Sequence, residues 1–457
     1  VGVQVHHDRT GHDGTACPGR GLIVERFVVI GLAHVRSAWF TEVARWSTLG
    51  TVPIDFVKCV SVEELRARVA SGRRFSAALV DGRLPAVDRD LLATLADQRI
   101  APLVVGPSDG PDWPSLGAAA RLAEPLDPGA LVEALEAHSA PVGLGDDTPG
   151  VDAAPLPSAT WRGRLVAVTG RSGSGVSTLA AALAQGLADD ARYGRDVILA
   201  DLARHAHQAL LHDARDVVPG LQELVEAHRS GRPTIDQHRR LTFDVPERGY
   251  RLLLGLRRPR DWVSVRRRAY EAALEGLRRS ARVVVTDTDA DLEGEAETGS
   301  FDIEDRNLVA RTTVRRADVV VVVATPTTTG IHGAVTLLDD LRRHGVAGSR
   351  TLVVVNRAPR AARARAELTG ALAELTRVGR GDADAHVGPV YIVERRHVDR
   401  LHRDLSRFPS TLVRPTADAV RLLLDRLPGL DDPLATEEPV PVLPGSLGRW
   451  APDEDDA

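Results

Sequence analysis

The sequence predicts an α/β protein with two parallel sheets in succession, and three observations support this fold class. Short apolar runs alternate with helical patterns over residues 26–138, and the same alternation returns over residues 163–428. Strands that alternate with helices indicate parallel pairing. The apolar runs of the second series are nearly continuous in Val, Leu and Ile, as in strands buried on both faces. Residues 139–162, rich in Pro, Gly, Ala and Asp, are the predicted linker.

The first predicted domain covers residues 25–138. Its expected strands are residues 26–32, 54–60, 76–81, 102–106 and 120–124, and its expected helices are residues 35–47, 61–71, 87–96 and 127–138. The polar, glycine-rich residues 1–24 lack the apolar side chains that a core needs, so we predict a disordered tail there.

The second predicted domain covers residues 163–428. Its expected strands are residues 164–170, 196–201, 251–255, 282–287, 318–325, 351–356 and 388–393. Residues 429–457 are acidic and rich in proline, and we predict a second disordered tail there.

Composition limits the class of protein. The 457 residues are 43% hydrophobic and 26% charged with a net charge of -5, which is typical of a globular protein. The longest apolar runs, such as residues 319–324, are far shorter than the roughly 18 residues of a membrane span. Two cysteines, Cys17 and Cys59, give no disulfide framework. We therefore expect a cytoplasmic protein without an integral membrane segment.

A glycine-rich segment follows the first strand of the second domain. The strand at 164–170 runs into the sequence GRSGSGVST, and a helical pattern follows at once. Gly170, Gly175 and Ser177 have the spacing of a P-loop, in which backbone N–H groups and a helix N-terminus hold a phosphate. The lysine position of that motif is Val176, and the chain's only lysine is Lys58. The alternative is a glycine-rich turn that only begins a helix.

The loop resembles the deviant Walker A motif of the MinD/ParA group, K-G-G-x-G-K-[ST]-[ST]. In that alignment Arg171 takes the signature-lysine position, Val176 takes the P-loop lysine position, and Ser177 and Thr178 close the motif. The CpaE/TadZ branch, with the actinobacterial CpaE-like and septum-site-determining proteins, often lacks the loop lysine and carries a receiver-like domain in front. The resemblance covers about residues 26–428.

This resemblance implies a receiver-like (flavodoxin-like) domain followed by a P-loop MinD/ParA-like domain with a mainly parallel sheet. It also implies a homodimer and the binding of ATP and Mg²⁺. The implied nucleotide-binding residues are Gly170, Arg171, Ser172, Gly173, Ser174, Gly175, Val176, Ser177, Thr178, Asp201 and Asn356.

Other landmarks of the group are partly kept. The D-x-D pair that follows the second strand retains Asp201 but has Ala203 at the place of the Asp that positions the attacking water. Asp287 ends the Walker B strand and, with Ser177, is implied as a Mg²⁺ contact; the alternative is an Asp that caps a strand end. Asn356 lies where the group often reads adenine, and its alternative is an ordinary turn residue.

These departures bear on catalysis. Phosphoryl transfer depends on positioning and on neutralising the charge that develops. A charge contact near a phosphate is worth up to about 4 kcal/mol at an effective dielectric of 20. Without the lysine and the second Asp, we expect weak binding of ATP and Mg²⁺ and little or no hydrolysis, and we assign no catalytic residue. Arg171 would instead reach the partner's nucleotide across a dimer.

The first domain is predicted to be a pseudo-receiver. Asp81 ends the third expected strand, where a receiver carries its phosphoacceptor. The acidic pair that would bind Mg²⁺ after the first strand is missing from residues 31–35, Gly106 replaces a Thr or Ser, and Glu124 replaces a lysine before Pro125. We therefore expect Asp81 to stay unphosphorylated, because the cation has no ligands.

Two other patterns, a group of histidines and several arginine clusters, also have explanations without a function. His205, His207 and His212 with Asp213 suggest a metal site, but on a helix His205 and His207 would point apart. Arginine clusters could bind DNA phosphates without sequence preference, although arginines on solvated faces would look the same; they lie at residues 257–260, 266–268 and 357–365.

The resulting hypothesis is a nucleotide-binding spatial organiser for septum-site placement or for pilus or secretion machinery. Its partners would be a second copy and the assembly proteins, which would place it at the cell pole, the septum or the membrane periphery. One alternative is an active ATPase that cycles between dimer and monomer, with non-specific DNA binding. Another is a DNA-binding response regulator, but a P-loop pattern stands where its helix-turn-helix would be.

Overall fold

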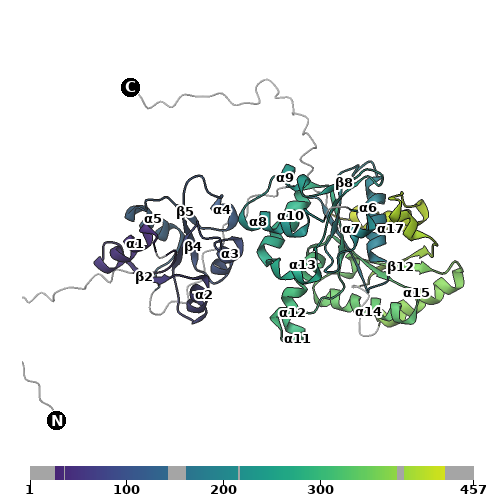
Figure 1. Cartoon of the computed structure of the whole chain (residues 1–457). Helices are drawn as coiled ribbons and strands as arrows, with labels where there is room; N and C mark the ends of the chain where they lie inside the picture. Colours follow the sequence, from purple (N-terminus) through teal and green to yellow (C-terminus); the bar gives the residue numbers. More distant parts are fainter. Residues whose placement is uncertain (1–25, 35, 143–160, 215–216, 378–384, 428–457) are drawn as a thin grey trace, which may run out of the picture. The chain divides into compact units, whose positions relative to one another are not determined.

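The computed structural model describes residues 26–34, 36–142, 161–214, 217–377 and 385–427. They form two compact units (Figure 1): the described residues up to Val87 and from Thr94 to 142 belong to the first, and Asp88–Ala93 and the described residues from 161 on belong to the second. The predicted tails and most of the predicted linker lie outside the described residues. No helix within the described ranges is both long and apolar enough to cross a membrane.

The first unit contains a five-stranded sheet with the order β2-β1-β3-β4-β5, and all of its neighbouring strands are parallel. This is the flavodoxin-like strand order, so the predicted fold class is confirmed. The strands are β1 (Phe27–Leu32), β2 (Ile54–Cys59), β3 (Ala77–Asp81), β4 (Ala101–Val105) and β5 (Ala120–Leu122).

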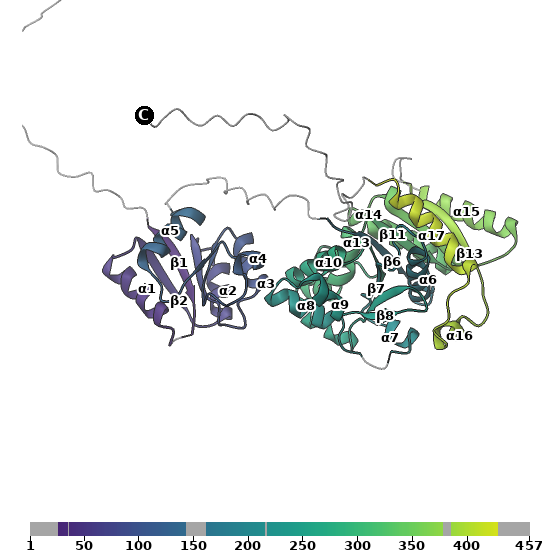
Figure 2. The same cartoon turned by 90° about the horizontal axis from the view of Figure 1, so that it is seen from above.

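Helices cover both faces of this sheet (Figures 1 and 2). They are α1 (Ala38–Leu49), α2 (Val62–Ala70), α3 (Arg89–Asp97), α4 (Trp113–Leu116) and α5 (Pro128–His138). Trp39 and Phe40 of α1 and Leu131 of α5 share one apolar core with the strands. The sequence did not predict α4, because four residues are too few to show a helical period.

The second unit contains an eight-stranded sheet with the order β13-β12-β11-β6-β10-β7-β9-β8. Among the described strands of this sheet only β8 pairs in antiparallel fashion, with β9, so the prediction of a mainly parallel sheet is confirmed. The strands are β6 (Arg164–Gly170), β7 (Val197–Asp201), β8 (Phe243–Val245), β9 (Tyr250–Leu253), β10 (Val283–Thr288), β11 (Val319–Ala324), β12 (Thr351–Ala358) and β13 (Val387–Val393). The sequence missed β8, a strand of three residues.

This sheet lies between two helical layers (Figure 2). One apolar core joins it to α8, α10, α13 and α14, and the other joins it to α6 and α17. The helices are α6 (Val176–Ala188), α7 (Gln208–Leu211), α8 (Leu221–Ser230), α9 (Ile235–Arg240), α10 (Arg267–Ser280), α11 (Glu295–Thr298), α12 (Phe301–Arg306), α13 (Leu308–Arg316), α14 (Thr328–Arg343), α15 (Ala362–Arg377), α16 (Val398–Arg403) and α17 (Ser410–Leu424), with 3-10 turns η1 (Pro259–Ser264) and η2 (Gly348–Arg350).

The central strand β6 marks the place where a ligand is expected. It lies between β11 and β10. The chain leaves β6 for β7 on one side of the sheet and later crosses to β11 on the other side. Ligands of open α/β sheets bind at the carboxyl ends of the strands where the strand order reverses in this way. The glycine-rich loop that follows β6 lies at that point.

Candidate functional site

The loop between β6 and α6 has the backbone of a phosphate loop. Gly173 and Gly175 adopt φ angles of +80° and +94°, a left-handed conformation that glycine adopts without steric cost. α6 begins directly afterwards at Val176 and runs for 13 residues. The first turn of a helix presents free N–H groups and a partial positive charge. The loop and the helix together therefore offer donors to an anion.

Two open clefts lie against this loop. The larger, of about 820 Å³, extends from the loop towards the segments that follow β7 and β10. The smaller, of about 540 Å³, extends towards the segment that follows β11. The larger cleft brings together most of the predicted residues, namely Gly170, Arg171, Ser172, Gly173, Gly175, Val176, Ser177, Thr178 and Asp287. Ser174 lines the smaller cleft.

Asn356 supports the loop through a hydrogen bond from its side chain. Its Nδ2 donates to the carbonyl of Ser174 at 2.8 Å, and its Oδ1 accepts from the backbone N–H of Arg357 at 2.9 Å. A Cβ on Gly175 would collide with the same amide. The expectation that β12 ends at Asn356 was wrong, because the strand continues to Ala358. The adenine contact stays a prediction, whereas the support of the loop is a role that the sequence did not show.

Val176 leaves the site without the usual loop cation. Its side chain packs against the apolar core beneath α6, and a Cβ on Gly170 would lie 3.1 Å from its Cγ2. The hydroxyl of Ser174 is buried and has no hydrogen-bond partner in the described structure. An anion bound here would find backbone N–H groups, hydroxyl groups and Arg171, but no lysine.

Gln208 contacts both predicted carboxylates of the site, Asp201 and Asp287. Asp201 ends β7 in full burial, and its Oδ2 accepts from the backbone N–H of Gln208 at 2.8 Å. The Gln208 side chain donates through Nε2 to Asp287 Oδ2 at 2.7 Å and to the Ser177 carbonyl at 3.0 Å. Burial raises the pKa of both carboxyls, and the nearby Asp287 raises that of Asp201 further. Gln208 was not predicted as a site residue, because no local motif marks it.

The two predicted Mg²⁺ contacts, Ser177 and Asp287, both line the larger cleft. The Ser177 hydroxyl hydrogen-bonds the Asp287 carboxylate, and the Gln208 amide donates to Asp287 Oδ2 and to the backbone carbonyl of Ser177. A hydroxyl and a carboxylate are oxygen ligands of the kind that Mg²⁺ prefers, so the Mg²⁺ site stays a prediction. Within the described ranges no group of three or more His, Cys, Asp or Glu is arranged to hold a metal ion.

A buried polar network continues from Gln208. The Gln208 carbonyl accepts from His212 Nδ1 at 2.8 Å, and His212 Nε2 accepts from the Tyr250 hydroxyl at 2.7 Å. Arg248 is fully buried, donates to the carbonyls of Ser406 and Leu401, and stacks on an aromatic ring. Burial lowers the pKa of His212 to about 4 and raises that of Tyr250 to about 12. This network ties the end of α7 to β9, to α16 and to the segment that follows α16.

The buried His212 predicts a loss of stability in acid. In the unfolded chain the pKa of His212 is near 6.5, and in the folded chain it is about 4, so the unfolded chain binds the extra proton first. The contribution of His212 is complete above pH 6.5 and is lost as the pH falls from 6.5 to 4, by at most about 1.4 kcal/mol per pH unit. Urea unfolding across this range should show a shallower pH dependence for His212→Gln, whereas exposed His332→Gln should match the unaltered protein. Equal slopes in all three would contradict this.

The histidines near the loop differ from their expected placement. His205 and His207 lie in the segment before α7 and line the larger cleft, so their expected helical placement was wrong. His402 of α16 lies 3.0 Å from the Thr178 hydroxyl through its Nε2, and burial lowers its pKa. The last hydroxyl of the loop motif is therefore held by a residue more than two hundred positions away.

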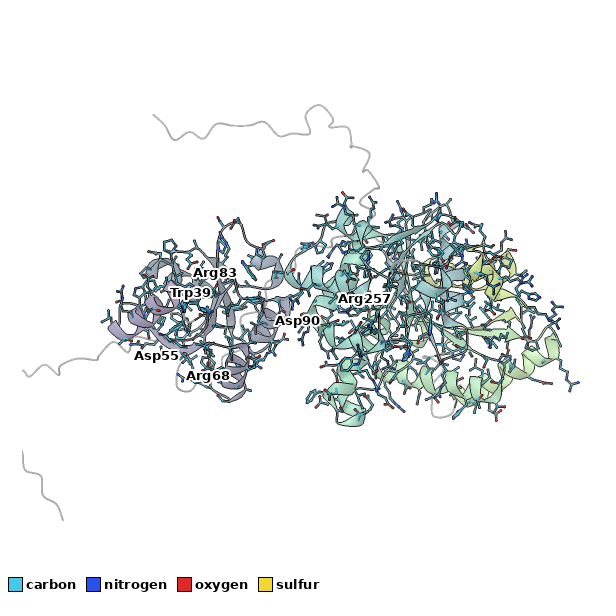
Figure 3. The ribbon with its side chains drawn as sticks, in the orientation of Figure 1. Trp39, Asp55, Arg68, Arg83, Asp90 and Arg257 are labelled. Atoms are coloured by element: carbon cyan, nitrogen blue, oxygen red, sulfur yellow. The ribbon has the colours of Figure 1, made fainter. Side chains whose placement is uncertain are left out.

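In the first unit, the guanidinium of Arg83 lies against the carboxylate of Asp81. Arg83, labelled in Figure 3, donates through Nε and Nη2 to the two oxygens of Asp81, both at 2.9 Å. The Ser37 hydroxyl donates to Asp81 Oδ2 at 2.9 Å, and Arg83 also pairs with Glu124 at 3.2 Å. Burial raises the pKa of Asp81, but the hydrogen bonds from Arg83 and Ser37 outweigh it and the pKa is lowered. A guanidinium thus neutralises the position where a receiver binds its cation.

Asp81 is therefore expected to resist a small phosphodonor such as acetyl phosphate. Both of its oxygens already accept hydrogen bonds from Arg83, and residues 31–35 lack the acidic pair that would bind a cation. Intact-protein mass spectrometry should show no mass gain on Asp81. Arg83→Ala should destabilise the unit by about 1–3 kcal/mol, the cost of depriving a buried charged acceptor of its guanidinium donors while the Ser37 hydroxyl bond remains. An acid-labile mass gain on Asp81 would refute the pseudo-receiver reading.

Comparisons with known proteins give remote structural likenesses. No protein-family model matches the sequence, and no curated protein matches it. The crystal structure of a ParA family ATPase from Chlorobium tepidum TLS has 13% identity and a TM-score of 0.45, over 56% of this chain and 98% of that one. A plasmid partition protein from Borrelia burgdorferi B31 bound to AMPPNP has 14% identity and a TM-score of 0.42, over 58% and 100%. The septum site-determining protein MinD from Pyrococcus horikoshii OT3, complexed with Mg-ADP, has 16% identity and a TM-score of 0.39, over 57% and 93%.

These similar structures are a ParA family ATPase, a plasmid partition protein and a MinD protein. At such low identities and TM-scores the likeness does not assign a function, so the interpretation of the site rests on its own geometry. The fold and the loop together define the class of protein: an α/β chain with a phosphate-loop backbone at the switch point of a mainly parallel sheet.

Proposed function

We propose that the protein is a nucleotide-binding spatial organiser of the MinD/ParA type, in the CpaE-like arrangement, that hydrolyses ATP slowly or not at all. The observation that carries this proposal is the loop itself. Its glycines and the N-terminus of α6 form an anion site beside an open cleft, while Val176 and Ala203 stand at the two positions on which hydrolysis depends in the group. Such a chain can bind a nucleotide as a signal without consuming it.

Arg171 supports a ligand with several negative charges. It lines both clefts, and a Cβ on Gly333 would lie 2.6 Å from its Cδ, so the glycine leaves room for the arginine chain. In the part of the chain that the structure describes, no acceptor pairs with its guanidinium. A planar guanidinium binds phosphate oxygens in a bidentate manner. ATP is therefore the proposed ligand.

The proposed partners are a second copy of the chain and the proteins of a septum or of a pilus or secretion assembly. The alternative of DNA binding is less favoured, because several clustered arginines are already paired. Arg257, labelled in Figure 3, contacts Glu223 at 2.5 Å, Arg267 contacts Glu304 at 2.7 Å, and Arg365 stacks on an aromatic ring. Paired arginines release fewer counterions from DNA than free ones do.

The affinity of the Gly175→Ala variant for ATP, compared with that of the unaltered protein, tests the proposal. The added Cβ meets Asn356 and is strained at a positive φ, so the loop should open and ATP affinity should fall at least about tenfold, or 1.4 kcal/mol. Gly194→Ala is the matched control, because Gly194 also has a positive φ but no atom lies within 4 Å of its Cβ position. Calorimetric titration with ATP measures both. No binding by the unaltered protein, or equal binding by both variants, would refute the proposed site.

A further inference from the structure

We propose that His402 controls the direction of the Thr178 hydroxyl, which can donate its hydrogen to a bound phosphate only when His402 is protonated, so that ATP binding takes up a proton. This inference rests on the proposed function. Thr178 is the third residue of α6 and lines the larger cleft. Its Oγ1 lies 3.0 Å from His402 Nε2, and within the described ranges the hydroxyl has no other hydrogen-bond partner. The hydroxyl and the histidine thus share one hydrogen bond beside the proposed phosphate site.

The direction of this hydrogen bond follows from the other ring nitrogen. His402 Nδ1 lies 3.3 Å from the backbone carbonyl of Leu211. A carbonyl can only accept, so the hydrogen of the neutral ring belongs on Nδ1, and Nε2 is left as an acceptor. The Thr178 hydroxyl then donates its single hydrogen to His402. Only lone pairs remain on the hydroxyl, and these repel phosphate oxygens, which are acceptors themselves.

Protonation of the ring reverses the bond. A charged imidazole donates through both nitrogens, so Nδ1 keeps its contact with Leu211 while Nε2 donates to Thr178. The hydroxyl hydrogen then becomes available to a phosphate oxygen, and a positive ring lies one hydrogen bond behind it. Because a bound phosphate favours the charged ring, ATP raises the proton affinity of His402. Protonation raises the affinity for ATP by the same factor.

The surroundings keep His402 neutral while no anion is bound. The side chain is buried. Burial lowers the pKa of His402 below its ordinary value, and the charge of Arg248 lowers it further. The Leu211 carbonyl and Asp399 raise the pKa, but they do not outweigh these effects. The neighbouring His212 adds no charge near neutral pH, since burial lowers its own pKa to about 4. An anion in the cleft would therefore shift the charge state of His402.

The experiment is calorimetric titration of the full chain with ATP in excess Mg²⁺, from about pH 8 to about pH 5.5, on both sides of the ordinary histidine pKa of about 6.5. Two buffers with different ionisation enthalpies give the number of protons taken up. His402→Gln keeps an amide beside Thr178 but cannot titrate. The affinity of the unaltered protein relative to this variant should rise by up to about tenfold for each unit that the pH falls. Protons that free ATP itself binds are common to both proteins and cancel.

Three other variants test the route through the hydroxyl. Thr178→Val removes the hydroxyl and should abolish the additional proton uptake, whereas Thr178→Ser keeps a hydroxyl and should retain it. His138→Gln is the matched control, because His138 is exposed at the end of α5, and its proton uptake should equal that of the unaltered protein. A histidine that only stabilised the fold would not produce this pattern.

The outcomes separate the two proposals. Equal proton uptake by the unaltered protein and His402→Gln would overturn the role of His402 and leave the proposed function standing. Absence of ATP binding at every pH would overturn the proposed function and this inference with it. Nitrogen NMR of the unaltered protein with isotopically labelled histidine needs no folded variant. Without ATP it should show the hydrogen of neutral His402 on Nδ1, and a hydrogen on Nε2 would overturn the inference.

Discussion

The purified protein is expected to release phosphate from ATP at the background rate. Two groups that the MinD/ParA group uses for this reaction are replaced. Val176 packs into the apolar core under α6 and cannot neutralise a phosphate, and Ala203, which lines the larger cleft, has no side-chain acceptor for an attacking water. A single positioned cation is worth about 10³–10⁵ in the rate of phosphoryl transfer. The loss of one such group already takes turnover close to background.

Restoring one group should not restore turnover. Val176→Lys returns a cation, but the water-positioning carboxylate is still missing, so phosphate release should stay far below that of an active ATPase. Val263→Lys is the matched control, because Val263 is 61% exposed and lies outside both clefts. The assay is steady-state phosphate release. Robust ATPase activity in the unaltered protein would support the alternative of an ATPase that cycles between dimer and monomer.

The sheets of this protein could be predicted from the sequence because burial on both faces leaves a strong signal. Runs such as residues 319–324 consist of Val and Ala alone and form the buried strand β11. The short elements left no such signal. β8 has three residues, of which Asp244 is exposed, and it depends on pairing with β9 rather than on its own pattern.

The loop could also be predicted, whereas the groups that surround it could not. The spacing of Gly170, Gly175 and Ser177 is local, so it is visible in one stretch of sequence. Gln208 reaches Asp287 across 79 positions, and His402 reaches Thr178 across 224. Such contacts depend on the order of strands in the sheet. Arg83 is different: it lies two residues after Asp81 and could have been noticed as a neighbouring cation.

Arg171→Ala is expected to weaken a dimer that forms through the phosphate-loop face. Two such loops facing each other would bury several phosphate charges, which need compensation. Arg171 is the basic residue within the loop itself, and its guanidinium has no internal partner in the described structure. Loss of a charge-assisted hydrogen bond costs about 1.5–3 kcal/mol. That is about 10-fold to 150-fold in the dimer dissociation constant, at 1.4 kcal/mol per tenfold.

Two further variants test whether the dimer needs the planar guanidinium of Arg171 or only a positive charge at that position. Arg171→Lys keeps the charge but loses the bidentate contact, so it should rescue the dimer only in part. Gly333→Ala keeps Arg171 but places a Cβ within 2.6–2.7 Å of its Cδ and Nε, so it should displace the side chain and weaken the dimer as well. Arg240→Ala, at an exposed position at the end of α9, is the matched control and should leave the dimer unchanged.

Sedimentation equilibrium with and without ATP measures these effects directly. ATP should strengthen the dimer of the unaltered protein and of Arg240→Ala, because the bound phosphates supply the acceptors that Arg171 of the other copy requires. It should strengthen the Arg171→Ala dimer much less, since the acceptors are present but the donor is gone. A dimer constant that responds neither to ATP nor to Arg171→Ala would mean that the phosphate-loop face is not the interface. The surface that binds a second copy would then have to lie on other elements of the chain.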